Sequence, residues 1–413
     1  MSNRSISQFE RTGRQLARRR VLGMVGVFGL AAAGTACHSA ATVDGVSSGS
    51  STPDASRVAA PPPRNVLGAN INGDTGWSNF AELKAVRATW LRAFFPMPAA
   101  DKGAVAAQPP IRTLLTAADN GYGTVLSLKF PYFKQAMPTA GSPAMNTALR
   151  RLDAVLAAVV GKVDVLVVGN EPFIECDDRN NPQLNIFYES IAQHVLTYRD
   201  QHGGPNGKTR IYMGALNHLD EPGWRTATTD RWMTYVRDNP TIDGVDIHPH
   251  VGEVNAAKQY LDYILPRLRA DQTFLATEFS LVLLWKKHLS NKISSAFATR
   301  YRLSPGTPVW QVIRDSIERP FPQQKWNDFL SMSPWFANNQ NYLGDQIESF
   351  RATGRLAVAT YGITQDADMV AHFGPHSTPW LLNSLFCPNT VQQTPNGLPG
   401  QTIPWVDQFR AAQ

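Results

Sequence analysis

The sequence predicts an α/β protein whose folded part is a (β/α)8 barrel, also called a TIM barrel. Short apolar runs recur eight times from residue 65 onward, with helical or loop-like segments between them. Most runs are continuous rather than alternating, as expected of strands that are buried on both faces. Eight repeats of strand then helix over about 350 residues fit a closed barrel better than an open doubly wound sheet.

The predicted strands follow one another in chain order, and amphipathic stretches such as 145–161 and 256–270 lie between them. No phosphate-binding loop of the GxGxxG or GxxxxGK[ST] type follows the first strand, so a nucleotide-binding fold is disfavoured and no cofactor is expected. The eight strands are NVLGANI (65–71), TWLRAFF (89–95), TVLSLKF (124–130), VDVLVVGN (163–170), RIYMGAL (210–216), IDGVDIH (242–248), TFLATEF (273–279) and LAVATYG (356–362).

The connection between the seventh and eighth strands is abnormally long. It spans about 75 residues, whereas connections in compact domains are usually much shorter, and a loop of this length commonly has its own secondary structure and a function. It also carries four tryptophans. We predict that residues 281–345 form a helical insertion over the C-terminal mouth of the barrel, where barrel enzymes build their sites. The tryptophans are Trp285, Trp310, Trp326 and Trp335.

Residues 1–37 have the layout of an export signal. A basic start precedes an apolar run of about 15 residues, which is short for a membrane span, and small residues follow. Arg18 and Arg19 ahead of the apolar run resemble a bacterial twin-arginine signal. We therefore expect an exported protein, located in the periplasm, in the cell envelope or outside the cell.

Cys37 closes the run of small residues and lies where a bacterial lipoprotein carries its lipid-modified cysteine. Gly34 stands where such signals usually have Leu, so ordinary cleavage beside Ala36 is the alternative to a membrane tether through Cys37. Residues 38–63 are rich in Ser, Ala and Pro and hold few large apolar groups. We predict that they form a disordered linker between the envelope and the folded domain, 64–413.

The net charge of +6 belongs mostly to the leader. Residues 1–36 hold six arginines and one glutamate, and removing them from the totals of 39 basic and 33 acidic residues leaves 33 and 32. The remainder contains no Lys/Arg stripe that would neutralise phosphates, so we expect no nucleic-acid partner.

The C-terminal ends of the predicted strands carry the candidate site. In a (β/α)8 barrel these ends converge on one face, whatever the chemistry. Two carboxylates stand out there, one on the fourth strand and one on the seventh. The residues at the strand ends are Arg92, Lys129, Asn170 with Glu171, Asn217 with His218, His248 with His250, Glu278 and Tyr361.

The fourth and seventh strands resemble those of the clan A glycoside hydrolases, which are retaining enzymes on (β/α)8 barrels. Asn170, Glu171 and Pro172 in VLVVGNEPF match the Asn-Glu pair that this clan places at the end of strand four, and Glu278 in LATEFS matches its nucleophilic Glu on strand seven. The resemblance covers the chain from about residue 65 to 413. It implies an O-glycosidase with Glu171 as acid/base and Glu278 as nucleophile.

The resemblance also implies residues that bind the carbohydrate substrate. An arginine near the nucleophile matches Arg92, and DIHPH is similar to the clan's His-x-Tyr, with His250 in place of Tyr. The eighth strand ends in Tyr361 where many members have Trp. The substrate-binding residues expected on this basis, including one from the insertion, are Asn170, Arg92, His248, His250, Tyr361 and Trp285.

The chemistry of glycoside cleavage asks for such a pair independently of the family. One carboxylic acid protonates the leaving oxygen and one carboxylate attacks the anomeric carbon, about 5 to 5.5 Å away. A neighbouring carboxylate and partial dehydration are expected to raise the pKa of Glu171. Arg92 is expected to keep Glu278 ionised. No metal is needed for this reaction.

Two other functions remain open on the sequence. A metal hydrolase could use His218, His248 and His250, because a His-x-His pair on a strand can bind zinc; metal barrels of the amidohydrolase type, however, carry such a pair on the first strand. A non-catalytic glycan-binding protein of the envelope is the other reading. The presence of both Glu171 and Glu278 argues against a decayed site.

The folded part holds two cysteines, Cys176 and Cys387. An exported protein can pair them in a disulfide, and two buried free thiols fit equally well. Two cysteines alone make a poor zinc site. We expect a monomer.

Overall fold

The computed structural model describes residues 62–72, 80–203 and 208–413, all within one compact unit that runs from Ala59 to Gln413. In these residues the strands β1 to β8 each pair in parallel with the next one along the chain, and β8 pairs with β1. The sheet therefore closes on itself, which confirms the predicted (β/α)8 barrel. The predicted export signal and all but the last two residues of the linker lie outside the described residues.

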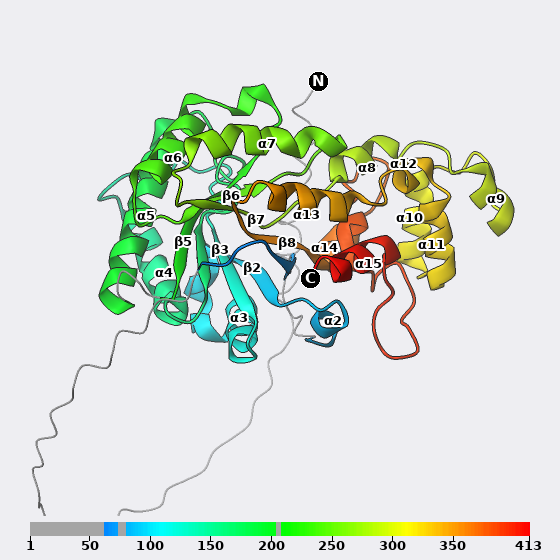
Figure 1. Ribbon diagram of the computed structural model, residues 1–413, viewed down its shortest axis with the longest axis horizontal. Coiled ribbons are helices and arrows are strands. Elements are labelled where there is room, and N and C mark those ends of the chain that lie inside the picture. The colour runs from blue at the N-terminus through cyan, green and yellow to red at the C-terminus, as the bar shows by residue number, and fades with distance from the viewer. Residues whose placement is uncertain (1–61, 73–79, 204–207) are drawn as a thin grey trace, which may run out of the picture. The chain divides into compact units, whose positions relative to one another are not determined.

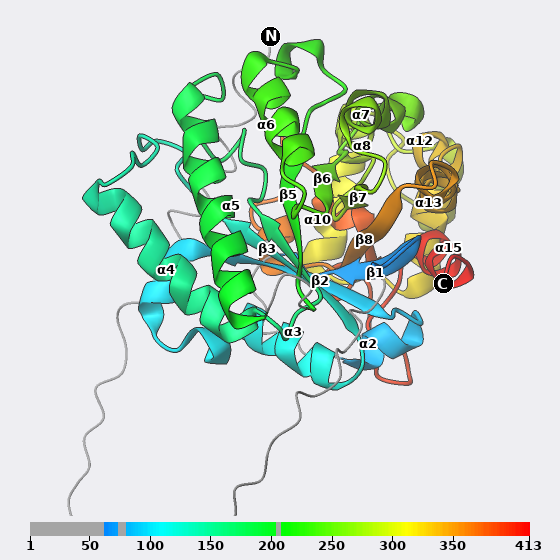
Figure 2. The ribbon, with the colours of Figure 1, turned by 60° about the vertical axis from the view of Figure 1, so that its left-hand side comes forward.

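All eight predicted strands form, with ends shifted by a few residues. Figure 2 shows them at the centre with helices around them. The barrel strands are β1 (Val66–Asn70), β2 (Trp90–Pro96), β3 (Gly123–Lys129), β4 (Val165–Val168), β5 (Arg210–Asn217), β6 (Gly244–His248), β7 (Thr273–Ala276) and β8 (Leu356–Thr364). A further strand, β9 (Ser384–Phe386), pairs in parallel with β8.

Helices separate the strands, and several begin at the caps that their sequences supply. Ser142 accepts a hydrogen bond from the Met145 amide at the start of α4, and Asn181 accepts one from the Gln183 amide at the start of α5. The helices outside the connection from β7 to β8 are α2 (Phe80–Ala85), α3 (Pro109–Asp119), α4 (Pro143–Val159), α5 (Pro182–His202), α6 (Ala227–Asp238), α7 (Ala257–Ile264), α14 (Ala367–Val370) and α15 (Ile403–Ala411).

The long connection from β7 to β8 is helical. Two of its tryptophans, Trp285 and Trp326, are fully buried and belong to the same hydrophobic core as the residues around the barrel. Figure 1 shows α9, α10 and α11 together at one side of the barrel strands. That this segment covers the mouth stays a prediction. Its helices are α8 (Val282–His288), α9 (Ser295–Tyr301), α10 (Val309–Glu318), α11 (Gln323–Ser331), α12 (Pro334–Ala337) and α13 (Tyr342–Ala352).

Among the helices of the described segments, none has the length and the apolar character that crossing a bilayer requires.

Cys176 and Cys387 are both buried and are not bonded to each other. The Cys387 sulfur lies 3.1 Å from the Thr402 hydroxyl oxygen. Of the two alternatives that the sequence left open, the structure therefore has two buried free thiols.

Gly169 lets β4 pass close to β5 directly before the candidate site. Its φ is +108°, which favours glycine, and a Cβ added there would lie 2.2 Å from the carbonyl oxygen of Gly214. We expect Gly169→Ala to lower the free energy of unfolding by about 1–3 kcal/mol more than Gly161→Ala does. Gly161 is the matched control, because its φ is +77° but nothing lies within 4 Å of an added Cβ. Denaturant unfolding of both variants measures the difference; equal losses would contradict the close contact.

Candidate active site

Glu171 leaves the barrel on a sharp turn after β4. The four residues of β4 are fully buried, and the backbone then turns at Gly169 and again at Glu171, whose φ is +51°. This left-handed conformation is uncommon for a residue other than glycine and occurs often at functional sites. The Glu171 carbonyl accepts hydrogen bonds from the amides of Ile174 and Glu175, both at 2.9 Å. The turn is thereby fixed, and the Glu171 side chain keeps 22% of its surface exposed.

Glu278 follows β7 by two residues and is held by two basic side chains. Nη1 of Arg92 donates to Oε1 of Glu278 at 2.5 Å, and Nε2 of His250 lies 3.5 Å from Oε2. The Glu278 side chain is 20% exposed, whereas Arg92 is fully buried. Burial raises the pKa of Glu278, but His248, Arg92 and His250 outweigh it, and the pKa lies well below its usual value of 4.5. Glu278 is therefore ionised, as a nucleophile must be.

The buried guanidinium of Arg92 links the two halves of the site. Besides Glu278, it donates to the side-chain oxygen of Asn70 at 2.9 Å, to that of Asn170 at 2.6 Å and to the Ser127 hydroxyl at 3.2 Å. A buried charge is tolerated when it is paired and hydrogen-bonded in this way. Arg92 thus fixes Glu278 and the residue before Glu171 in one rigid network.

Glu175 extends this network and has no counterpart among the residues expected from the sequence. Its Oε1 accepts from Nδ2 of Asn170 at 3.1 Å and lies 2.7 Å from Nζ of Lys129. Burial raises the pKa of Glu175 to about 7, although Lys129 and Asn170 lower it. Glu175 lies four residues after Glu171 in the sequence, but no pattern in the sequence marks it as part of the site, because the turn that brings it back to Asn170 is seen only in the structure.

A chain of hydrogen bonds fixes the orientation of His248. The amide and hydroxyl of Thr277 donate to the Asp246 carboxylate at 3.0 and 2.5 Å, and Nε2 of His248 lies 2.9 Å from that hydroxyl oxygen. Because the hydroxyl gives its only proton to Asp246, it accepts from Nε2, which is therefore protonated. Nδ1 of His248 then faces Oε1 of Glu171 at 3.2 Å.

The proton between His248 and Glu171 is shared by the pair. Burial and Glu278 raise the pKa of Glu171, but the hydrogen bond and charge of His248 outweigh them and lower it below 4.5. Burial lowers the pKa of His248, but Glu278, Glu171 and Asp246 raise it above 6.5 overall. The expected raised pKa of Glu171 is thus wrong for Glu171 alone, because an imidazole lies beside it. The pair as a whole keeps one proton up to the raised pKa of His248.

This shared proton sets an expected pH dependence. If the pair supplies the proton for the leaving group, kcat/KM should fall as pH rises through the raised pKa of His248, above 6.5. On the acidic side it should fall only where Glu278 becomes protonated, well below 4.5. A profile of kcat/KM against pH measures both limits. A basic limb centred below pH 6 would contradict the shared proton.

Three further residues lie near the Glu171–His248 pair, namely His250, Trp380 and Asn217. Nδ1 of His250 is 2.8 Å from the Ser280 hydroxyl oxygen, and the Trp380 ring lies edge-on to the His250 ring, with 4.8 Å between centroids. Asn217 on β5 is the register partner of His248 on β6, and neither polar atom of its buried amide has a hydrogen-bond partner among the described residues. Trp380 belongs to η6 (Trp380–Asn383), which follows β8, and no periodicity in the sequence distinguishes it from the other tryptophans.

No protein-family model and no curated protein matches this chain. Solved structures do resemble it. They include xylanase B from Clostridium stercorarium F9 (15% identity, 83% of this chain and 96% of that chain, TM-score 0.49). A second is the exo-beta-1,4-mannosidase Op5Man5 from Opitutaceae bacterium strain TAV5 (13% identity, 84% of this chain and 59% of that chain, TM-score 0.49). A third is a hyperthermophilic endocellulase from the archaeon Pyrococcus horikoshii (10% identity, 86% of this chain and 93% of that chain, TM-score 0.47). At these identities the likeness concerns the fold alone.

Two residues expected to bind substrate lie elsewhere. Tyr361 is 1% exposed and packs against Phe279 and Trp405, with ring centroids 5.2 and 6.3 Å away. Side chains alternate between the two faces of a strand. The Thr360 hydroxyl donates to the backbone carbonyl of Thr277, and the next side chain, Tyr361, points to the opposite face, toward the helices. This arrangement removes Tyr361 from the candidate site.

Trp285 is likewise part of a core. It is fully buried, its ring lies 5.6 Å from that of Trp335 and 5.3 Å from that of Phe336, and its Nε1 donates to Asn383 at 3.1 Å. No face of the ring is left for a sugar. Trp285 therefore packs α8 against α12 and η6 rather than lining the site.

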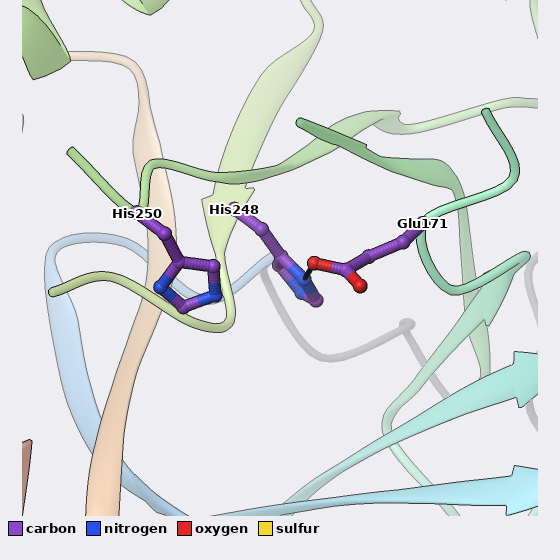
Figure 3. Close-up of side chains that lie close together, drawn as sticks. All are labelled: Glu171, His248 and His250. Carbon is purple, nitrogen blue, oxygen red and sulfur yellow. Dashed lines mark hydrogen bonds and ion pairs between the residues drawn. The ribbon is translucent and has the colours of Figure 1, made fainter. Parts of the chain in front are cut away.

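The histidines expected for a metal site are only partly together. Figure 3 shows His248 between His250 and Glu171, and one ligand atom from each of the three lies within 4.8 Å of the others. His218 is outside this group: its Nδ1 lies 3.2 Å from Glu221, and its ring stacks on Trp224. The three-histidine metal site considered from the sequence is therefore not the arrangement found among the described residues.

Proposed function

We propose that this chain is a retaining glycoside hydrolase in which Glu278 is the nucleophile and Glu171 the acid/base. The observation that carries the proposal is the contrast between two carboxylates at the ends of β7 and β4. Glu278 is held ionised by Arg92 and His250, whereas Glu171 shares a proton with His248. Glycoside cleavage by double displacement requires one ionised carboxylate and one carboxyl group that can deliver a proton, and at Glu171 that proton is held jointly with His248.

In the first step, Glu278 attacks the anomeric carbon and forms a glycosyl-enzyme ester, while the proton held by Glu171 and His248 passes to the leaving oxygen. In the second step, Glu171 with His248 takes a proton from water, which attacks the same carbon and releases Glu278. Asn217 supports the substrate assignment, because its unpaired buried amide is suited to a sugar hydroxyl.

The rival function of a metal hydrolase leaves the Arg92 network without a role. In a retaining glycosidase, a buried guanidinium that donates hydrogen bonds to Glu278 and Asn170 keeps the carboxylate nucleophile ionised and fixed in position. The mechanism proposed here routes no step through a metal. We therefore expect turnover to survive treatment with EDTA, and activity abolished by EDTA and restored by zinc would favour the rival.

A screen of the purified folded domain against polysaccharides and aryl glycosides tests the proposal. Hydrolysis should appear with at least one glycoside and should disappear in both Glu171→Gln and Glu278→Gln, which keep the size of the side chains. Glu189→Gln is the control, because Glu189 pairs with Arg231 on α6, away from the strand ends. Activity that persists in both catalytic variants would remove the assignment. Glycan binding without hydrolysis would favour the non-catalytic alternative.

We also propose that the protein is exported and acts in the envelope or outside the cell. The twin-arginine pattern at Arg18 and Arg19 and the Ser/Pro-rich stretch 38–63 support this. Cell fractionation with mass spectrometry should find mature chains that begin at or near Cys37. A diacylglycerol on Cys37 would indicate a lipid anchor, and cleavage beside Ala36 without lipid would indicate free release. Full-length cytoplasmic protein as the main species would contradict export.

A further inference from the structure

Glu171, His248 and His250 each bring one possible metal-ligand atom into the same small region. These atoms lie within 4.8 Å of one another, and two imidazole nitrogens with one carboxylate oxygen form a ligand set that zinc prefers. We propose that these three residues bind a zinc ion and that zinc bound there inhibits the enzyme. The inhibitory effect rests on the proposed glycosidase function; the binding does not.

The hydrogen bonds around the histidines leave the correct nitrogens available. Nε2 of His248 donates to Thr277, which is bonded to Asp246, so Nδ1 faces Glu171 and can bind a metal once the proton shared with Glu171 is displaced. Metal-binding histidines are commonly oriented in this way, with the second nitrogen bonded to a group that leads to a carboxylate. The Asp246–Thr277 pair would therefore hold His248 in position for a metal.

His250 supplies the third ligand. Its Nδ1 lies 2.8 Å from the Ser280 hydroxyl oxygen, while its buried Nε2 makes no geometrically defined hydrogen bond with any residue that the structure describes. Nε2 is only 3.5 Å from Glu278, which adds negative charge beside the site.

The distances suit zinc after a small movement. Ligands bound to a tetrahedral zinc at about 2.0–2.1 Å lie about 3.3 Å apart. Oε1 of Glu171 and Nδ1 of His248 are already 3.2 Å apart. The ligand atom of His250 lies within 4.8 Å of both and closes the site by moving at most about 1.5 Å. The fourth position is left for water.

Zinc at this site would occupy the place of the catalytic proton. A Glu171 oxygen and Nδ1 of His248 bound to zinc can no longer hold a proton between them, so no acid remains for the leaving group. The ion would also lie beside Glu278, where the sugar has to enter. We therefore expect inhibition that EDTA reverses and that high substrate concentration opposes.

Direct binding is tested first, without reference to activity. The full chain, stripped with EDTA, is titrated with zinc in competition with a chromophoric chelator. We expect His250→Phe to weaken the zinc affinity at least about 100-fold, and Ser280→Ala, which keeps all three ligands, to weaken it about 10-fold. His218→Phe is the matched control and should bind zinc as the wild type does. Equal affinity in the wild type and His250→Phe, or no binding by the wild type, would overturn the proposed site.

Inhibition is tested with the same proteins on an aryl glycoside. Zinc should inhibit the wild type at the concentrations at which it binds, and Ser280→Ala should need about 10-fold more zinc for the same inhibition. Zinc that binds through His250 without inhibiting would overturn the regulatory part. A wild type without activity in either EDTA or zinc would instead overturn the proposed function and leave the binding result intact. Activity that requires zinc would show a metal hydrolase.

Discussion

Glu278→Gly is expected to lower turnover by at least about 10⁴-fold, which corresponds to about 5.4 kcal/mol in the activation barrier. The carboxylate that Arg92 holds ionised would be missing, so no glycosyl-enzyme ester could form. Removing the side chain also opens space beside the anomeric carbon. Azide should enter there, attack from the vacated side and restore part of the activity. The product should be a glycosyl azide of inverted configuration, identified by NMR.

Glu278→Gln is the matched control for this rescue. The amide fills the space of the carboxylate, so the variant should be as inactive as Glu278→Gly but should not respond to azide. Thermal unfolding of both variants separates loss of the nucleophile from loss of the fold. Rescue of neither variant, or a rescued product of retained configuration, would count against Glu278 as the nucleophile.

Glu171→Ala is expected to give the second largest effect, and the size should depend on the leaving group. For a sugar leaving group, which needs protonation, the rate should fall about 10²–10⁴-fold. For an activated aryl leaving group, formation of the glycosyl-enzyme should be largely spared and its hydrolysis should slow for want of a base. Azide should then speed this second step and give a product of retained configuration.

Burst kinetics with a dinitrophenyl glycoside measure the two steps separately. A burst of phenol in Glu171→Ala, absent from the wild type, is the expected result. Glu171→Gln is the control for volume, because it keeps the side-chain size without an exchangeable acid proton. Equal losses for activated and unactivated substrates would mean that Glu171 does not protonate the leaving group.

The barrel could be predicted from the sequence because each strand is a continuous apolar run between helical segments. Strand ends were less certain: β4 is Val165–Val168, whereas the strand predicted from the sequence spans 163–170. The positions of Glu171 and Glu278 followed from topology, since parallel strands bring their C-terminal ends to one face. No knowledge of side-chain contacts was needed for that step.

Side-chain direction and electrostatics were harder to predict. Tyr361 ends an apolar run, but β8 continues to Thr364 and the alternation of the strand turns the ring outward. The pKa of Glu171 depends on a hydrogen bond to His248, which is distant in the chain. Trp380 reaches His250 from a segment after β8. Each of these features depends on tertiary contacts that local sequence patterns do not contain.

The stereochemistry of the wild-type product tests the central claim most directly. NMR of the first-formed sugar, recorded before mutarotation, reports the configuration at the anomeric carbon. Attack by Glu278 followed by water predicts retention. A product of inverted configuration would contradict the assignment of Glu278, and would imply instead two carboxyl groups about 6.5–9.5 Å apart with a water between them.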